Sequence, residues 1–167
     1  MSLRIETERL IITELTEDMA PAIQRQSLDE ATRRFLPDEV FETLEEAQET
    51  VRALINAYPS PDGPFVYAVL TAKAFVGYVQ LCPVQDGWEI GYHIGEGYRG
   101  LGYAPESVRA FLPEIMARLG LKEVWGVVAE ENAASCRVLE KCGFALVERG
   151  EGLYHGETRL RRRYLYP

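Results

Sequence analysis

The 167-residue sequence contains no apolar run of about eighteen residues, the length that a membrane-spanning helix requires. Its first ten residues, MSLRIETERL, carry too many charges for a signal peptide. It also contains no internal repeat and no stretch that resembles an interdomain linker. We therefore expect one domain over residues 1–167 of a cytoplasmic protein with no membrane partner, long enough to bury a sizeable core.

Histidine and cysteine are both scarce. His93 and His155 are too few for a histidine-based metal site, and the three cysteines show neither a CxxC pattern nor metal-ligand spacing. We therefore expect no metal. Cys82, Cys136 and Cys142 are interpreted as packing residues, with an acyl-cysteine intermediate on Cys136 as the alternative.

Positive charge is in the minority, with 18 Lys and Arg against 26 Asp and Glu and a formal net charge of −8. A nucleic-acid partner is not expected, because such binding needs a basic surface. An acidic surface attracts cationic substrates such as amines or basic peptides, although it can also serve solubility alone. The basic run from Arg159 to Arg163 is the exception. We interpret it as a solvated strand face, with a contact to RNA or coenzyme phosphates as the alternative.

The stretch from Glu89 to Ala104, EIGYHIGEGYRGLGYA, predicts a buried strand, a glycine loop and the start of a helix. Pro105 is typical of a first helical turn. A loop of this kind before a helix N-terminus is typical of an anion site, because the first-turn N–H groups lack partners and the macrodipole is positive there. The loop matches neither the Rossmann fingerprint nor the P-loop pattern. A purely structural tight turn is the alternative.

A second informative stretch runs from Asn132 to Phe144, NAASCRVLEKCGF. Together with GYRGLGYA and the opening ETERLIITELT, it resembles the GNAT superfamily of N-acetyltransferases, and most of all the branch that acetylates the N-termini of ribosomal proteins. The resemblance covers nearly the whole chain. One departure is Gly97, which stands where the superfamily's phosphate motif has Arg or Gln. Arg99 is the candidate for the missing cation.

The patterns predict an α/β fold with a mixed sheet of about seven strands and about four helices. The expected strands are residues 10–14, 65–70, 75–81, 88–94, 123–129, 145–149 and 158–166. The expected helices are residues 18–26, 43–58, 105–119 and 133–142, with a turn at 33–37. The strands on either side of the third helix form a βαβ crossover and should be parallel; the resemblance implies that this central pair splays apart.

Two helix ends carry clear signals. Thr43 and Glu46 predict a capping box at the start of the second helix. Gly143 and Phe144 predict a Schellman motif at the end of the fourth. In the resembling family the two early helices and their loop form one wall of the acceptor cleft, so this segment is expected to set substrate choice.

The resemblance implies that acetyl-CoA is the cosubstrate and that its pantetheine arm lies between the splayed strands. By that analogy the main-chain groups of His93 and Ile94 contact pantetheine, and the side chain of Asn132 lies near it. Asn132 is also a good helix N-cap by residue type. The pyrophosphate is expected to bind the main-chain N–H groups of Arg99, Gly100, Leu101, Gly102, Tyr103 and Ala104.

Ser135 and Glu89 are the candidate catalytic residues. In the resembling N-terminal acetyltransferases a serine at the position of Ser135 is proposed to protonate the leaving thiolate; otherwise it is an ordinary first-turn serine, and Tyr92 or Tyr98 could replace it. Glu89 shares a strand face with His93 and could accept the amine proton through water. The alternative is a solvated residue at a strand start. Other candidate bases lie in the last hairpin: Glu151, His155 and Glu157.

The expected function is acetyl transfer from acetyl-CoA to a primary amine, by direct attack in a ternary complex. About a tenth of an α-amine is neutral at pH 7, against less than about a thousandth of a lysine amine. Because the sequence shows no unambiguous base, a protein N-terminus is the leading acceptor and a small amine (amino acid, polyamine or antibiotic) the second. A CoA-binding sensor without catalysis, and a nucleotide-binding module unrelated to CoA, are the rivals. The sequence leaves open whether the last hairpin joins a homodimer.

Overall fold

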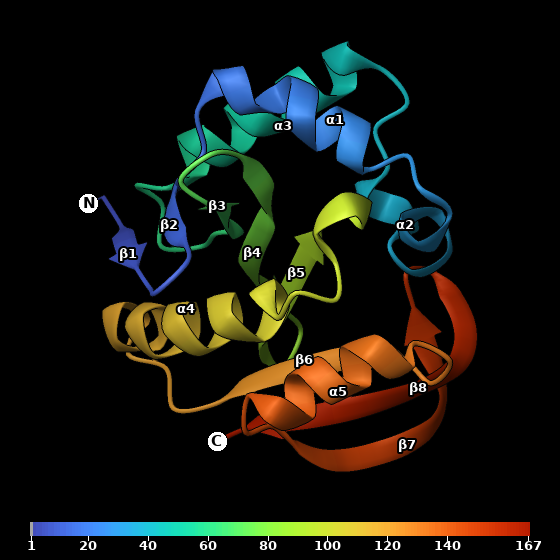
Figure 1. The fold of residues 1–167 in the computed structure, drawn as a ribbon. Coiled ribbons are helices and arrows are strands. Elements are labelled where there is room, and N and C mark those ends of the chain that lie inside the picture. Colours follow the sequence, from blue (N-terminus) through green and yellow to red (C-terminus); the bar gives the residue numbers. More distant parts are fainter. Residues whose placement is uncertain (1) are drawn as a thin grey trace.

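This computed structural model describes residues 2–167. Its strands form one mixed sheet, and helices cover both faces of the sheet (Figure 1). The described residues form eight strands in the order β1-β2-β3-β4-β5-β6-β8-β7. Their bounds are β1 Arg4–Glu6, β2 Ile11–Glu14, β3 Phe65–Leu70, β4 Phe75–Val84, β5 Gly87–Ile94, β6 Val124–Ala129, β7 Ala145–Tyr154 and β8 Glu157–Tyr166. The helices are α1 Ala20–Gln26, α2 Glu30–Phe35, α3 Leu44–Ala57, α4 Tyr103–Leu119 and α5 Ala133–Lys141, with single 3₁₀ turns η1 Glu17–Met19, η2 Pro37–Glu39 and η3 Glu96–Tyr98.

The mixed α/β architecture is therefore confirmed, with one strand and one α-helix more than expected. The additional strand is β1, which pairs with β2 although only three residues long. The additional helix is α2, where residues 33–37 were expected to form a turn. That prediction was wrong because Asp29 caps the segment: its carboxylate accepts a hydrogen bond from the Thr32 N–H at 3.2 Å.

The buried side chains form two cores, one on each face of the sheet. Alternate residues of a strand point to opposite faces, so β3 contributes Val66 and Ala68 to one core and Phe65, Tyr67 and Val69 to the other. The first core packs on α1 and α3, and the second packs on α4 and α5. We call the corresponding sides of β4 and β5 the α2 face (Tyr78, Gln80, Cys82, Glu89, Gly91, His93) and the α5 face (Ile90, Tyr92, Ile94).

The centre of the sheet opens between β5 and β6. These strands are parallel, as the βαβ pattern predicted, but their pairing is limited to Glu89 and Trp125. Past that point β5 leads into η3 and the glycine loop, while β6 continues beside β8. The main-chain edge of β5 is therefore left without a strand partner on this side, which agrees with the splayed pair that the resemblance implied.

One predicted helix end is confirmed in full, and the capping box at the other is confirmed in half. Thr43 accepts a hydrogen bond from the Glu46 N–H at 3.2 Å, while the Glu46 carboxylate accepts from the Glu42 N–H rather than from Thr43. At the end of α5 the Phe144 N–H donates to the Leu139 carbonyl at 3.0 Å, and Gly143 has φ +90°. This is the predicted Schellman geometry. The last hairpin is also present, with β7 and β8 each ten residues long.

Candidate active site

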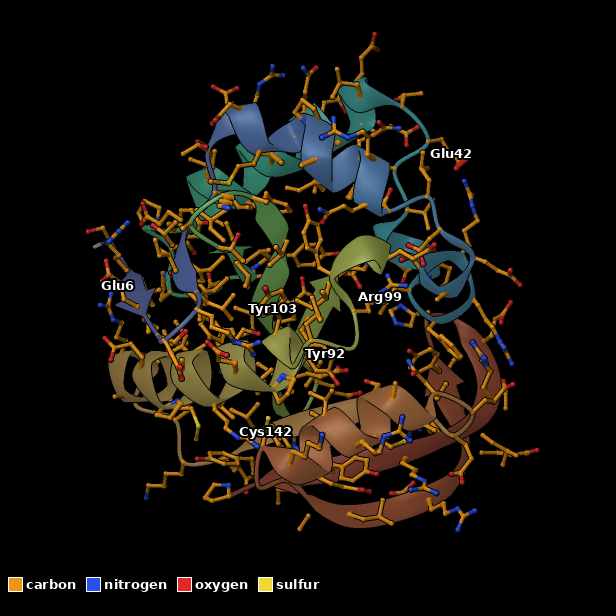
Figure 2. The ribbon with its side chains drawn as sticks, viewed as in Figure 1. Glu6, Glu42, Tyr92, Arg99, Tyr103 and Cys142 are labelled. Carbon is orange, nitrogen blue, oxygen red and sulfur yellow. The ribbon has the colours of Figure 1, made fainter. Side chains whose placement is uncertain are left out.

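A cavity of about 600 Å³ passes through the sheet where β5 and β6 separate. Glu89 and His93 line it from the α2 face, whereas Tyr92 and Ser135 line it from the α5 face. Figure 2 shows Tyr92, Arg99 and Tyr103 gathered near the centre of the molecule, around the ends of β5 and α4. The candidate residues from the glycine loop, from β5 and from α5 are thus brought to one place.

The glycine loop offers unpaired N–H groups at the start of α4. Gly100 and Gly102 have φ of +77° and +84°, values that L-residues rarely adopt. The main-chain N–H groups of Gly100, Leu101 and Gly102 have no hydrogen-bond acceptor within residues 2–167, and α4 has no side-chain cap. Space is open around Gly100, where an added Cβ would meet nothing within 4 Å. These features fit the pyrophosphate of acetyl-CoA.

Arg99 is held differently from what the sequence suggested. Its guanidinium donates to Asp29 Oδ2 at 2.8 Å and to the Ile94 carbonyl at 2.7 Å, and its main-chain N–H donates to the Glu96 carbonyl at 3.4 Å. Burial opposes ionisation of Asp29, but hydrogen bonds from Arg99 and Thr32 lower its pKa to about 2. The guanidinium is therefore committed to α2, and neither part of Arg99 is free to supply the cation or the N–H group expected of it.

The main-chain groups of His93 also face away from the gap. Gly95 N–H donates to the Val76 carbonyl at 2.8 Å, so alternate residues of β5 are directed to β4. His93 lies in this set, and its carbonyl faces Gly77 of β4. Ile94 lies in the other set and faces β6, although its carbonyl already accepts from Arg99. Of the two residues expected to contact pantetheine through the main chain, Ile94 therefore keeps only its N–H for that contact, and His93 keeps neither group.

The side chain of His93 instead forms part of the cavity wall. It is 5% exposed, its Nε2 lies 2.8 Å from Thr32 Oγ1, and its ring stacks on Tyr78. Burial and the adjacent Arg99 lower the pKa of His93 to about 4. The imidazole is therefore neutral at neutral pH and links β5 to α2.

Asn132 and Ser135 begin α5 beside the gap. Asn132 Oδ1 accepts from the Ser135 N–H at 3.3 Å, so the N-cap interpretation of Asn132 is confirmed. Ser135 Oγ lies 2.5 Å from the Tyr92 hydroxyl, and both residues line the cavity. Burial raises the pKa of Tyr92. Two hydroxyl groups that can pass a proton to each other therefore stand on the α5 face of the gap.

Carboxyl groups stand on the opposite, α2 face. Glu89 is half-buried, and burial raises its pKa, while the charge of His155 opposes that shift. Glu39 of η2 lies in the same cavity, and its Oε1 accepts from the Tyr78 hydroxyl at 2.8 Å. Burial raises the pKa of Glu39 as well, and the hydrogen bond from Tyr78 lowers it. This side of the cavity therefore favours a cationic group.

His155 reaches the same side of the cavity from the β7–β8 turn. Its Nδ1 lies 2.7 Å from Asp38 Oδ2, and its ring meets that of Tyr154 edge-on. Glu151 and Glu157, the other two candidate bases of this hairpin, are exposed and do not line the cavity. Of the three candidate bases in this hairpin, His155 is therefore the one that lines the cavity.

Sequence reasoning missed three residues of this acidic side: Asp38, Glu39 and Tyr78. Asp38 and Glu39 follow Pro37 in a segment that was expected to be a connection, and Tyr78 looked like an ordinary strand residue. One signal was present, because two carboxyl residues came directly after Pro37, the last residue of the predicted turn. Without the fold, nothing connected them to Glu89.

Cys136 and Cys142 pack in the core, as expected. Cys136 is 5% exposed and is absent from the cavity wall, so the acyl-cysteine alternative has no support. Cys82 does line the cavity, where burial raises its pKa to about 12 and keeps the thiol protonated. Within residues 2–167 no group of His, Cys, Asp and Glu side chains could hold a metal ion, and no helix there is both long and apolar enough to cross a membrane.

The basic run of β8 was expected to be a solvated strand face, but several of its arginines form ion pairs with acidic residues. Arg162 forms an ion pair with Glu130 at 3.0 Å, and Arg163 pairs with Glu148 at 3.1 Å while its guanidinium lies over Trp125. These partners account for both side chains within the folded chain. A phosphate contact is not needed to explain them.

Comparison with known proteins places these features in a family. A family model described as an acetyltransferase (GNAT) domain matches residues 9–145. An uncharacterised N-acetyltransferase of Bacillus subtilis, YoaA, is 28% identical over 144 residues, which are 84% of this chain and 81% of that protein. The FsC-acetyl coenzyme A-N(2)-transacetylase of Aspergillus fumigatus is 31% identical over 116 residues, which are 64% of this chain and 49% of that protein. A solved RimL ribosomal L7/L12 α-N-protein acetyltransferase bound to coenzyme A shares the fold with a TM-score of 0.83 and 19% identity, over 98% of this chain and 97% of that one.

Proposed function

The chain belongs to the GNAT acetyltransferase family and is an N-acetyltransferase, and from this premise we propose that it transfers the acetyl group of acetyl-CoA to the α-amine of a protein N-terminus. One observation carries the proposal: a single cavity joins a loop with free N–H groups to an acidic chamber on the α2 face of the sheet. We use this name for the part of the cavity lined by Glu39, Glu89 and His155. The cosubstrate and the amine can therefore enter from opposite faces and meet at the gap between β5 and β6.

The α5 face holds the cosubstrate. The N–H groups of Gly100, Leu101 and Gly102, together with the first turn of α4, bind the pyrophosphate, and the free N–H of Ile94 binds the pantetheine arm. When bound, the coenzyme supplies an acetyl group that is activated as a thioester. Ser135, backed by Tyr92, protonates the departing thiolate on this face.

The α2 face holds the amine. Glu39 and Glu89 attract the ammonium form, and Glu89 takes its proton through a water molecule. Burial raises the pKa of Glu89, which makes its carboxylate a stronger base than a solvated one. The acid and the base are therefore on opposite faces: the ammonium proton leaves through Glu89, whereas sulfur takes its proton from Ser135.

The α-amine is the leading acceptor because its deprotonation needs only a weak base. About a tenth of it is neutral at pH 7, and a carboxylate with a raised pKa is then a sufficient base. The similarity to the RimL α-N-protein acetyltransferase supports the same choice.

A small cationic amine is the second candidate, because the acidic chamber is closed over on one side. The Tyr154 hydroxyl donates to the Phe35 carbonyl at 2.6 Å, and Arg159 Nη1 donates to the Arg34 carbonyl at 2.9 Å. These bonds join the β7–β8 hairpin to α2 over the cavity. A compact amine fits such a chamber without any movement of the hairpin away from α2. The name of one relative, an N(2)-transacetylase, is compatible with this second candidate.

The test is acetyl-CoA consumption, followed as free thiol, with lysine-free peptides that have a free N-terminus, amino acids, polyamines and aminoglycosides. Calorimetric titration with acetyl-CoA accompanies it. We expect the highest kcat/KM with a peptide N-terminus and none with the same peptide N-terminally blocked. Thiol release with polyamines alone would establish the second candidate, and tight acetyl-CoA binding without release from any amine would support a sensor instead.

A further inference from the structure

His155 occupies a turn position that few residues other than glycine adopt. Tyr154 pairs with Glu157, so His155 and Gly156 alone make the turn between β7 and β8. Their φ angles are +49° and +80°, and His155 is the one non-glycine residue with positive φ within residues 2–167. Turns of this type favour Asn-Gly or Gly-Gly. Here this tight turn holds an ionisable ring at a fixed place beside the cavity.

The contacts of His155 leave one ring nitrogen available. Nδ1 lies 2.7 Å from Asp38 Oδ2. An ionised carboxylate can only accept, so Nδ1 carries the proton of the neutral ring and Nε2 has a free lone pair. Within residues 2–167 the ring hydrogen-bonds through Nδ1 alone, and Nε2 makes no hydrogen bond. The ring is thus oriented by a carboxylate and presents an acceptor nitrogen, the arrangement that proton transfer requires.

Of the three side chains of Glu89, His155 and Asp38, that of Asp38 is the most exposed to solvent. Glu89 is half-buried in the cavity wall. The side chain of His155 is 23% exposed and that of Asp38 is 68% exposed. A proton taken up by Glu89 must reach solvent once per turnover, and His155 lies between the cavity and the exposed carboxylate.

We propose that His155, oriented by Asp38, is the proton-relay residue that receives the amine proton from Glu89 and passes it to solvent. The proposal rests on the acetyl transfer proposed above. The substrate ammonium gives one proton to Glu89 through water, and Glu89 passes it to His155 Nε2. The nitrogen lone pair then forms the bond to the acetyl carbon, and the C–S bond breaks with its electron pair on sulfur. Sulfur gains a proton from Ser135, which is restored by the second proton leaving nitrogen, so one proton in all leaves through His155.

The charges around His155 suit a relay. Glu39, Glu89 and Asp38 are the carboxyl groups that face it, Tyr154 lies against its ring, and a proton on His155 lowers the pKa of both glutamates against the effect of burial. The negative charge of these carboxylates therefore stabilises a proton while it is on the imidazole.

The experiment uses His155→Asn in the full chain, with a hexapeptide bearing a free N-terminal serine as the acceptor. Asparagine suits the positive φ and Asn-Gly is a favoured turn, so the variant should fold at least as well as the native chain, but it cannot titrate. We expect kcat to fall about tenfold at pH 6.5, less than the hundredfold or more typical of a base that contacts the substrate. The fall should shrink toward pH 8.5, and Asp38→Asn should show a smaller loss of the same form.

Two further readouts separate a relay from a purely structural role. The kcat of His155→Asn should rise with buffer concentration at constant pH, whereas the native enzyme should not respond. Imidazole should restore activity to His155→Gly, which also suits the turn. Native kcat in His155→Asn, or a loss that neither buffer nor imidazole changes, would overturn the relay while the acetyltransferase assignment stands. Absence of thiol release by the native chain with every amine would instead show that the proposed function itself has failed.

Discussion

The hydroxyl oxygens of Tyr92 and Ser135 lie 2.5 Å apart at the gap between β5 and β6. The Tyr92 hydroxyl also lies 3.1 Å from the Ser135 carbonyl, to which it can donate. Tyr92 is fixed by β5 and Ser135 by the first turn of α5, so the pair bridges the two elements that border the gap. A proton that leaves Ser135 can therefore be replaced from Tyr92.

Ser135→Ala should lower kcat by about a hundredfold and leave the acetyl-CoA dissociation constant unchanged, because loss of a positioned acid affects the chemical step. Tyr92→Phe should have a smaller effect of the same kind. Since the two hydroxyls act in series, the double variant should be no slower than Ser135→Ala alone. Steady-state kinetics and calorimetry on the four proteins measure this, and native turnover in Ser135→Ala would remove its role as acid.

The glycine loop gives a second prediction. Gly102→Glu places a carboxylate at the start of α4 and a side chain on a residue with φ +84°, so acetyl-CoA affinity should fall by at least about tenfold. Gly120→Glu is the matched control, because Gly120 also has a positive φ, +66°, and nothing lies within 4 Å of an added Cβ, but it stands at the other end of α4 from the loop. Calorimetry on both folded variants tests the assignment. Equal affinities for acetyl-CoA would show that the loop does not hold the pyrophosphate.

The elements that border the gap could be predicted from the sequence because their signals are local. The β5–loop–α4–β6 unit follows from an apolar run, two glycines and a helical pattern, and the Asn132 cap and Gly143 end of α5 depend on residues within one or two turns. The same local signals gave Ser135 its place beside the gap. They carried no information about Tyr92 as its hydrogen-bond partner, which is 43 residues away in the chain.

The acidic side of the cavity could not be predicted, because its contacts join distant segments. His155 and Asp38 are 117 residues apart, and Tyr78 and Glu39 are 39 apart. Arg99 shows the same limit: its sequence position suggested a phosphate ligand, whereas Asp29, 70 residues earlier, binds its guanidinium. Short motifs identify a residue type at a position but do not say which partner the tertiary structure provides.

Arg99 therefore gives a third prediction. Arg99→Ala should lower the stability of the fold, since it leaves the carboxylate of Asp29, 10% exposed, without its ion-pair partner. The acetyl-CoA dissociation constant should change less than about threefold, well below the effect expected of an arginine that binds phosphate. Thermal unfolding and calorimetry give the two quantities.

Asp29→Asn is the control for Arg99→Ala. It removes the same ion pair but leaves the positive charge beside the loop, so its loss of stability should be similar and the double variant should add little. A large loss of acetyl-CoA affinity in Arg99→Ala that Asp29→Asn does not share would return Arg99 to the phosphate site.

His93 gives a pH-dependent prediction. Burial and Arg99 lower its pKa from 6.5 to about 4, so the unfolded chain binds the proton more readily than the folded one. The stabilisation by neutral His93 is therefore fully present above pH 6.5 and is lost as the pH falls from 6.5 to about 4. Across that interval it amounts to about 3 kcal/mol.

Urea unfolding of the native chain and of His93→Gln between pH 7.5 and 4.5 tests this. Glutamine keeps a hydrogen-bonding side chain toward Thr32 but does not titrate, so the stability of His93→Gln should fall less on acidification than that of the native chain. The comparison uses the slope of stability against pH rather than its level, because Glu39 and Glu89, with raised pKa values, contribute the opposite slope in both proteins. Equal slopes in the two proteins would show that His93 is not held neutral by the contacts that join β5 to α2.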